Sequence, residues 1–498
     1  MKLVFALLAL LTAACGTPSG APSAPAPPRP NIVLILADDL GYSDTSPYGG
    51  EIRTPNLQRL ADEGLRFTQF YDNAKCTTTR ASLLSGMYPR GRGDSIPRAF
   101  PTLAESLRAA GYQTGMTGKW HLGGKGGARP NERGFDEYYG LLGGAGNYFD
   151  PTRPDPGFKG GRMRAFAHNE TPIESFPPDF YATDAYAAHA VETIERFARD
   201  GRPFFVYLAF TAPHYPLQAP PEDIARYRGR YARGWDELRR ERQSRQLALG
   251  LLDPRWALAP TDPQSYAWAD ANQEWEDLRM ATYAAMVDRM DQGIGRVLAT
   301  LDALGIADDT VVVFLSDNGG SPEEPGGRDP TAQPGLVDTY TSVGPAWGSA
   351  QNTPFRRYKS WVDEGGISTP FIVRWPGRVA PNAKTGQIGH VIDVAPTLLE
   401  LARAESPANL EGRSLAPLLR GGTVEPPAEL FWRWSRNRAV RRGKWKLVWD
   451  SEREPLAWRL YDMEADRTEL RDLAAEQPEL VRSLAESHSR WLEETGRN

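Results

Sequence analysis

The chain has 498 residues, a formal net charge of −5, 24% charged residues and 40% hydrophobic residues. This balance is ordinary for a folded globular protein, and it excludes a polytopic membrane protein and a mostly disordered chain. The slightly negative net charge argues against nucleic acid as a main partner. The two cysteines, Cys15 and Cys76, are too few for a disulfide framework or for a zinc motif of paired cysteines.

The first thirty residues predict an export signal followed by a tether. A single positive charge, a short apolar run and small residues form the pattern of a signal peptide over residues 1–14. The residues before Cys15 resemble a bacterial lipobox, although an ordinary signal peptide that happens to contain a cysteine is the alternative. Residues 15–30 are rich in Pro and Ala, as in a semi-extended tether. We therefore expect export to the cell envelope or periplasm, with a lipid on Cys15 as the only membrane attachment.

Three apolar runs without polar alternation, at 31–37, 203–210 and 310–316, predict strands that are buried on both faces of a sheet. Residues 102–110 and 280–301 show the spacing of apolar residues that is typical of helices, and a glycine follows each segment. This alternation indicates an α/β fold with a large, mostly parallel central sheet flanked by helices.

Two long segments of this α/β unit, which we place at residues 31–404, lack such a pattern. Residues 220–277 are rich in Arg, Trp and Tyr and are too long for a simple loop, so we expect a partly helical surface insertion. We expect its arginines on a solvated face, with contact to an anionic substrate as the alternative. Residues 321–350 are rich in Gly and Pro and are predicted to form a long active-site loop.

A second, smaller α+β domain is predicted over residues 405–498. Residues 439–449 alternate like an exposed antiparallel strand around a turn, and residues 459–462 are its expected partner. A helix from about residue 478 to residue 495 closes the chain.

Polar side chains follow two of the predicted strands. Asp38-Asp39 comes directly after the strand at 31–37, and Asp317-Asn318 after the strand at 310–316. Ligands of open α/β sheets gather beyond the carboxyl ends of strands, and carboxylate and amide oxygens suit a hard divalent cation, Ca²⁺ or Mg²⁺. Neighbours on a straight strand point to opposite faces, so both members of a pair can face one ion only if the chain turns there.

The segment 75–86 is predicted to be a helix entry, with hydroxyls that cap free amides and Gly86 as the stop. Cys76 and Arg80 are four residues apart, so they share one face of a helix. A nucleophile at a helix N-terminus beside an arginine suits a bound oxyanion. For a single cysteine, the alternative is an inert buried hydrophobe.

Further cationic side chains indicate an anion site around the metal. Lys119 and His121 would face the same way in an extended segment, and prolines on both sides hold His214 in a non-helical loop. The candidates for this anion site are Lys119, His121, His214 and Lys359, together with Arg80. The other four histidines, His168, His189, His390 and His488, have no comparable context, and we assign them no role.

Taken together, these motifs resemble the type I, formylglycine-dependent sulfatases of the alkaline-phosphatase superfamily. The resemblance covers residues 31–498 and rests on Asp38-Asp39, the block 76–86, Gly118-Lys119-Trp120-His121, Pro213-His214, Asp317-Asn318, and Lys359 with Glu364-Gly365-Gly366. The insertion, around residues 227–231 and 234–236, is similar to bacterial arylsulfatases in particular. The resemblance implies an alkaline-phosphatase-like fold and hydrolysis of sulfate esters.

In that family a formylglycine-generating enzyme oxidises the cysteine to formylglycine, whose hydrate attacks sulfur while Ca²⁺ holds the sulfate. The resemblance implies that Cys76 becomes the formylglycine. It also implies a site for Ca²⁺, rather than Mg²⁺, made of Asp38, Asp39, Asp317, Asn318 and the modified Cys76. By the same resemblance Arg80 fixes the hydrate and His121 helps to break down the sulfated hydrate. The residues that would bind sulfate and neutralise charge at the leaving oxygen are Lys119, His214 and Lys359.

One position departs from the family pattern, Cys-x-Pro/Ala-x-Arg, because Thr78 occupies the Pro/Ala position. Two alternatives stay open at this stage. A hydrolase of phosphate mono- or diesters, or of phosphonates, would use the same scaffold, since a fold does not fix its substrate. A catalytically inactive binding lipoprotein would result if Thr78 blocked the maturation of Cys76.

Overall fold

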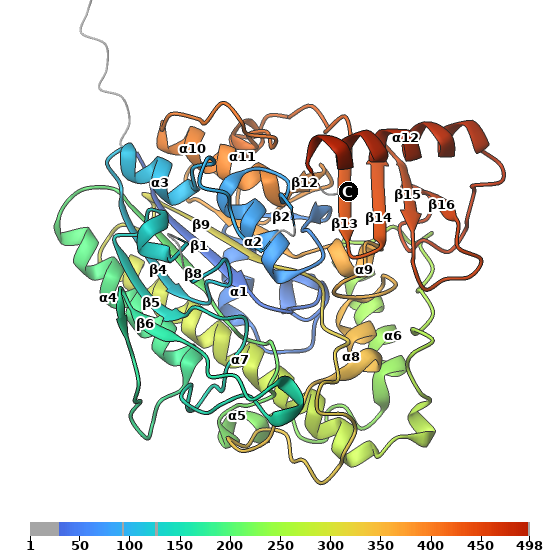
Figure 1. Cartoon of the computed structure of the whole chain (residues 1–498), viewed down its shortest axis with the longest axis horizontal. Coiled ribbons are helices and arrows are strands. Elements are labelled where there is room, and N and C mark those ends of the chain that lie inside the picture. Colours follow the sequence, from blue (N-terminus) through green and yellow to red (C-terminus); the bar gives the residue numbers. More distant parts are fainter. Residues whose placement is uncertain (1–28, 92–93, 125–127, 497–498) are drawn as a thin grey trace, which may run out of the picture.

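The structure is a computed structural model that describes residues 29–91, 94–124 and 128–496. Its centre is a ten-stranded sheet with the strand order β11-β2-β10-β9-β1-β8-β4-β5-β6-β7 (Figure 1). In chain order these strands are β1 (Asn31–Ala37), β2 (Leu65–Phe67), β4 (Gln113–Gly118), β5 (Glu137–Leu141), β6 (Phe166–His168), β7 (Thr171–Pro172), β8 (Phe204–Ala209), β9 (Thr310–Ser316), β10 (Phe371–Arg374) and β11 (Ala383–Thr385). The five strands β9, β1, β8, β4 and β5 are parallel, and antiparallel pairs border them.

The central strands are buried on both faces, as the unbroken apolar runs predicted. Along β1, Val33 and Ile35 belong to one apolar core, and Ile32 and Leu34 belong to another. One face is covered by α1 (Pro55–Asp62), α4 (Ala182–Arg199), α5 (Pro221–Ala225), α6 (Gly234–Ala248), α7 (Gln273–Ala303) and α8 (Gly344–Gln351). The other face is covered by α2 (Cys76–Ser85), α3 (Leu103–Ala109), α10 (Val394–Ala402) and α11 (Ala416–Leu419). The predicted α/β fold is therefore confirmed.

Local sequence signals explain where the two predicted helices begin. Thr102 accepts a hydrogen bond from the backbone N–H of Glu105, and the Glu105 side chain caps Thr102 in return, which forms a capping box at the start of α3. Asn272 caps α7 by accepting a hydrogen bond from the N–H of Trp275. The predicted helix at 280–301 lies within α7 and supplies its core-facing residues.

The insertion at 220–277 is partly helical, as expected, and contains α5 and α6. The expectation that its arginines lie on a solvated face is wrong for Arg239 and Arg242, which are 2% and 0% exposed. Arg242 forms ion pairs with Asp44 at 2.6 Å and Glu51 at 2.9 Å. A buried guanidinium needs such partners, and they come from a segment distant in the sequence. The insertion is therefore pinned to the α/β unit.

The C-terminal part forms a separate four-stranded antiparallel sheet in the order β13-β14-β15-β16 (Figure 1). Its elements are β13 (Leu430–Trp434), β14 (Asn437–Arg442), β15 (Trp445–Trp449), β16 (Trp458–Asp462) and α12 (Pro478–Glu494). The expected exposed face does not exist. Val440 packs under α12 with Leu484, and Ala439 faces a second apolar cluster with Tyr71 of the α/β unit. Both faces are covered because this sheet fills the space between α12 and the α/β unit.

The remaining strands and α-helix are short: β3 (Phe70–Tyr71), β12 (Gly389–His390) and α9 (Glu364–Ile367). Among the described residues, no helix combines the length and the apolar character that crossing a membrane requires. The predicted signal peptide, Cys15 and nearly all of the tether lie outside the described residues.

Candidate active site

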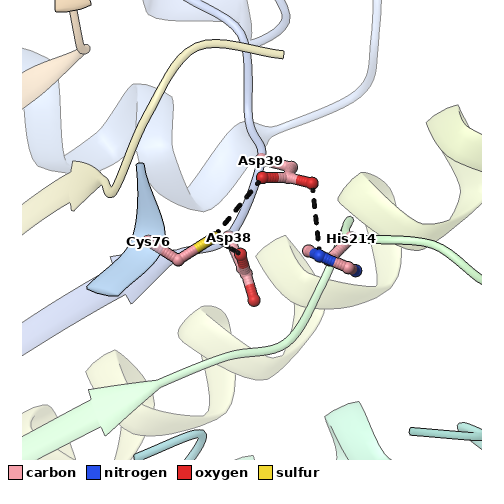
Figure 2. A group of neighbouring side chains, drawn as sticks. All are labelled: Asp38, Asp39, Cys76 and His214. Carbon is pink, nitrogen blue, oxygen red and sulfur yellow. Dashed lines mark hydrogen bonds and ion pairs between the residues drawn. The ribbon is translucent and has the colours of Figure 1, made fainter. Parts of the chain in front are cut away.

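The first pair of predicted metal ligands lies directly at the carboxyl end of β1. Asp38 and Asp39 are 0% and 1% exposed. Asp39 has a left-handed backbone with φ of 62°, an uncommon conformation for a residue other than glycine. The chain thus turns off the strand at this residue, and both carboxylates face one buried cluster (Figure 2).

The second pair, Asp317 and Asn318, follows β9, which is the parallel neighbour of β1. The N–H of Asp39 donates to Asp317 Oδ1 at 3.2 Å, and Asn318 Nδ2 donates to Asp39 Oδ1 at 2.7 Å. Gly319 comes next, where a Cβ would lie 2.0 Å from the carbonyl oxygen of Gly365. Only glycine fits there, and this close approach brings the segment after residue 355 up to the site.

Cys76 is the first residue of α2 and is 1% exposed. Its Sγ lies 3.5 Å from Asp38 Oδ1 and 3.9 Å from Asp39 Oδ1. Figure 2 shows the thiol directed at the two carboxylates, with His214 on their other side. The helix ends at Gly86 in a left-handed conformation, as predicted.

The hydroxyls at the start of α2 do not cap the helix amides, contrary to our expectation. Lys75 is the N-cap and makes no side-chain cap. Thr78 Oγ1 donates to the carbonyl oxygens of Asn73 and Lys75, both at 2.8 Å, and Thr79 Oγ1 accepts from the N–H of Asn73 at 2.9 Å. Helical side chains point back toward the N-terminus, so these hydroxyls bind the preceding turn instead. They hold the turn that presents Cys76.

Arg80 and Lys119 are fully buried on the Asp38 side of the cluster. Arg80 Nε and NH2 contact Asp317 Oδ2 at 3.0 and 2.8 Å, and NH1 donates to the carbonyl oxygen of Lys119 at 2.9 Å. Lys119 Nζ forms an ion pair with Asp38. These contacts fix two positive charges beside the thiol of Cys76.

Two more predicted residues approach Asp39 from the opposite side. Lys359 Nζ contacts Asp39 Oδ2 at 2.8 Å, and His214 Nε2 lies 3.5 Å from the same oxygen. His214 Nδ1 lies 2.6 Å from the carbonyl oxygen of Tyr215. An N–H on Nδ1 donates to that carbonyl, which leaves the Nε2 lone pair toward the site.

His121 reaches the same region by a route that the sequence pattern did not show. We expected an extended segment, but His121 has φ of 58° and Gly118 has φ of 106°. The chain therefore bends after β4. Burial and the positive charges of Lys119 and Arg80 lower the pKa of His121 well below its ordinary value. A Cβ on Gly144 would lie 2.5 Å from the imidazole, so this glycine leaves room for the ring.

Burial and the neighbouring charges shift the pKa values of the side chains in this cluster. Burial and the Asp317 carboxylate raise the pKa of Asp38 to about 7. Burial also disfavours the charge on Asp39, but the positive charge of Lys359 outweighs it and lowers the pKa of Asp39 to about 2. Burial lowers the pKa of His214 to about 3, which makes the imidazole neutral at pH 7. A cation among the carboxylates would relieve the cost that raises the pKa of Asp38.

Glu323 is a site residue that the sequence reasoning missed. It lies in the segment 321–350, which we expected to be a loop throughout but which enters helix α8 at Gly344. The Glu323 carboxylate contacts Lys359 Nζ at 3.2 Å, Lys75 Nζ at 2.8 Å and the Tyr215 hydroxyl at 2.7 Å. Lys75 in turn lies 5.7 Å over the ring of Trp434 from the C-terminal sheet. We call these residues, Lys75, Tyr215, Glu323 and Trp434, the rim. Only its place in a Gly/Pro-rich loop shortly after Asp317 could have indicated Glu323.

All ten predicted site residues therefore converge from separate segments on one cluster. Comparison with known proteins identifies the family. A family model described as Sulfatase matches residues 30–404, and one described as N-sulphoglucosamine sulphohydrolase, C-terminal, matches residues 356–494. The chain belongs to the sulfatase family.

Relatives of known name support this assignment. The chain is 35% identical to an arylsulfatase of Klebsiella aerogenes, over 78% of this chain and 90% of that protein. It is 35% identical to an uncharacterized sulfatase of Schizosaccharomyces pombe, over 94% of each chain. It is also 32% identical to mouse steryl-sulfatase, over 86% of this chain and 71% of that protein. This sulfatase is accordingly a sulfuric ester hydrolase.

Solved structures confirm the alkaline-phosphatase-like fold. The crystal structure of Ps i-CgsB in complex with a neocarrahexaose has a TM-score of 0.70 at 27% identity and covers 93% of each chain. A phosphonate monoester hydrolase of Agrobacterium radiobacter has a TM-score of 0.60 at 19% identity, with 94% of this chain and 96% of that chain covered. The second likeness shows a shared fold alone, because identity at this level does not carry function.

Proposed function

We propose that this sulfatase hydrolyses sulfate monoesters through a formylglycine formed from Cys76, with Ca²⁺ held by Asp38, Asp39, Asp317 and Asn318. The observation that carries the proposal is the position of Cys76. Its Sγ lies 3.5 Å from a carboxylate of the candidate metal cluster, at the start of a helix. A nucleophile there reaches an ester group that also touches the cation.

The residues of the cluster fit a hard divalent cation. They offer three carboxylates and one amide oxygen, which are ligands that Ca²⁺ prefers. The Oδ1 of Asn318 is fully buried and has no hydrogen-bond partner among the described residues. An orphaned buried oxygen is costly unless a cation or a donor meets it. Ca²⁺, when bound, would polarise the sulfate oxygens and orient the ester sulfur toward position 76. The Sγ of Cys76 lies 3.5 Å from Asp38 Oδ1, so a modified residue 76 would be near enough to complete the ligand set.

An unmodified thiol suits this chemistry poorly. Burial, together with the Asp317 carboxylate, raises the pKa of the Cys76 thiol above its ordinary value. Cysteine nucleophiles act as thiolates and normally have a lowered pKa. A sulfated thiol also has no easy route to release, whereas the hydrate of formylglycine supplies one hydroxyl for attack and a second for elimination of sulfate. The surroundings of Cys76 therefore favour its modified form.

The buried lysine and arginine side chains of the site would stabilise the negative charge that develops on the sulfate oxygens during the reaction. Lys119 and Lys359 stand on opposite sides of the two carboxylates of Asp38 and Asp39, so they would contact different oxygens of a bound sulfate. Arg80 is held by Asp317 and would orient the hydroxyls at residue 76.

The two histidines would handle protons. A bound anion favours the protonated form of His214, which would then donate at the leaving oxygen. The low pKa of His121 makes it a neutral base, which would accept the proton whose loss releases sulfate.

The position of the rim suggests how the organic part of the substrate is held. Lys75, Tyr215, Glu323 and Trp434 lie next to Lys359 and combine charge with aromatic surface, so we place the leaving group against them. Such a rim suits aryl sulfates, which the name of the Klebsiella relative indicates, and sulfated sugars, which the description of the family model over residues 356–494 indicates.

For the cellular location, we propose export by the signal at 1–14 and anchoring through a lipid on Cys15, which the pattern of residues 1–30 supports. A formylglycine-generating enzyme is then a required partner during maturation.

The decisive experiment combines mass spectrometry with paired substrates. Peptide mapping across Cys76 of active protein should show an aldehyde in place of the thiol. Cys76→Ala should abolish turnover of an aryl sulfate and leave the thermal unfolding temperature unchanged, since the change removes little volume. Rates on the matching aryl phosphate should be far lower than on the sulfate. Full activity with an intact thiol would refute the formylglycine proposal, and a faster phosphate reaction would favour the phosphoester alternative.

A further inference from the structure

A second cluster of metal-ligating side chains lies away from the active site, at the β5–β6 edge of the sheet. Glu137 is the first residue of β5, His168 is the last residue of β6, and His189 lies in α4. Figure 1 shows these elements together on the side of the molecule opposite the C-terminal sheet. One ligand atom from each residue lies within 4.8 Å of the other two. The cluster shares no residue with the active site.

The two imidazoles converge on a single carboxylate oxygen. His168 Nε2 lies 2.6 Å from Glu137 Oε1, and His189 Nε2 lies 3.3 Å from the same atom. Zn–N and Zn–O bonds of about 2.0–2.1 Å in a tetrahedral site place two ligand atoms about 3.3–3.4 Å apart. The contact of His189 already has this separation. His168 needs a small outward rotation, and its side chain is 51% exposed and therefore free to make it.

Neighbouring residues prepare these groups as ligands. His189 Nδ1 lies 2.6 Å from Thr117 Oγ1, and in the tautomer with its proton on Nδ1 the imidazole donates to Thr117 and turns the Nε2 lone pair to the cluster. The ring of His189 also stacks on Tyr139, with ring centroids 4.9 Å apart. Arg196 NH2 holds the second oxygen of Glu137 at 2.7 Å, which leaves Oε1 for the ion. Outer contacts of this kind orient the ligands of metal sites.

The cluster is open to solvent, and Glu192 adds a second carboxylate beside the ion pair of Glu137 with Arg196. A cavity of about 420 Å³ lies over the three ligands and is also lined by Glu192. An ion can enter from this cavity, and water can fill the coordination positions that the protein leaves open.

We propose that Glu137, His168 and His189 bind one Zn²⁺ or a related first-row transition-metal ion. Two imidazoles and one carboxylate suit such an ion, whereas Ca²⁺ prefers oxygen ligands alone. Three protein ligands leave the fourth position of a tetrahedral ion to water from the cavity. This site is separate from the sulfatase chemistry and does not depend on the mechanism proposed above.

The test is a titration of the full protein with Zn²⁺ in excess Ca²⁺, which keeps the oxygen-rich active site occupied. Calorimetry should show one binding event, and Co²⁺ should give the visible absorption bands of a four- or five-coordinate site with nitrogen ligands. His168→Ala and His189→Ala should each weaken Zn²⁺ binding at least tenfold. His168 is half exposed, so its replacement leaves the fold intact. Activity on an aryl sulfate should stay unchanged in both variants.

Glu192→Gln is the matched control, because it removes a charge from the same cavity without removing a ligand. It should bind Zn²⁺ like the unaltered protein. Absence of saturable Zn²⁺ binding would overturn the proposal. Equal affinity in the unaltered protein and in His168→Ala would overturn it as well, since the ion would then lie elsewhere. If Glu192→Gln loses as much Zn²⁺ affinity as His168→Ala, general electrostatic attraction explains the binding, and a specific site is refuted.

Discussion

Glu364 lies at the centre of a buried ion-pair network that joins the α/β unit to the C-terminal sheet. Its carboxylate contacts Lys446 Nζ at 2.9 Å and Arg467 Nε at 2.8 Å, and it accepts hydrogen bonds from the Tyr71 hydroxyl at 3.0 Å and from Ser368 at 3.1 Å. These three charged side chains are fully buried, and so is Glu469, whose carboxylate contacts Lys446 Nζ at 2.8 Å. The segment that carries Glu364 also carries Lys359 of the active site, so the network helps to hold Lys359 in position.

The variant Glu364→Gln tests how much this network contributes to stability. The amide keeps the shape of the side chain but removes its charge. Lys446 and Arg467 bind different oxygens of Glu364, so the NH2 group of the amide faces one of these two donors. Lys446 keeps a second carboxylate, Glu469, so Arg467 is the cation that loses its partner. Breaking one partner of a buried ion pair costs about 3–5 kcal/mol when the remaining charge stays buried without compensation. We expect the free energy of unfolding to fall by this amount. Activity on an aryl sulfate should fall as well, because the position of Lys359 loosens.

Urea-induced unfolding followed by near-UV circular dichroism gives the measurement, since the midpoint and the m-value together yield the change in free energy. The matched control is Glu479→Gln. Glu479 is 78% exposed in its pair with Arg482, and exposed pairs contribute at most about 1 kcal/mol. If both variants lose the same small amount, the network does not stabilise the junction and our reasoning is wrong.

The pH dependence of the same variant has a definite sign. Burial disfavours the charge on Glu364, yet Lys446 and Arg467 outweigh it and lower the pKa from 4.5 to about 2. A carboxylate with a lowered pKa in the folded state stabilises the protein fully above the unfolded pKa of 4.5. Its contribution is lost as the pH falls toward 2. The difference between Glu364→Gln and the unaltered protein should therefore shrink below about pH 4.5.

Three further predictions concern the active site and the N-terminus. Exhaustive chelation should abolish aryl sulfate turnover and added Ca²⁺ should restore it, whereas full activity of metal-free protein would exclude a catalytic cation. In Thr78→Pro, mass spectrometry should find an equal or higher aldehyde content at position 76. Proline has no N–H, and the N–H of the third helical residue has no partner within the helix, so the helix loses no hydrogen bond. A lower aldehyde content would show that the Thr78 hydroxyl is needed. Unaltered protein should partition into the detergent phase and Cys15→Ser into water; an aqueous unaltered protein would rule out the lipid.

The strands and helices that carry the site could be predicted because their signals are local. An unbroken apolar run such as 31–37 fits only a strand with both faces buried, and the polar pairs after it must lie at the edge of the sheet. The spacing of Cys76 and Arg80 fixed them to one face of a helix. Each of these inferences needs only residues that are close in the sequence.

Other features depend on contacts between distant segments, which no local pattern contains. Arg242 looked like a surface residue, yet it is buried because Asp44 and Glu51 meet it almost two hundred positions away in the chain. Glu323 entered the site for the same reason, through Lys75 and Lys359.

The sequence by itself determined the fold class, the apolar strands and the chemical types that gather at their ends. The tertiary structure decided which charges meet. The convergence of His168 and His189 on Glu137 is an example, because neither histidine has a neighbour in the sequence that suggests a ligand. The physical reason is that burial of apolar residues follows a short repeat along the chain, while the partner of a buried charge is set by how whole elements pack.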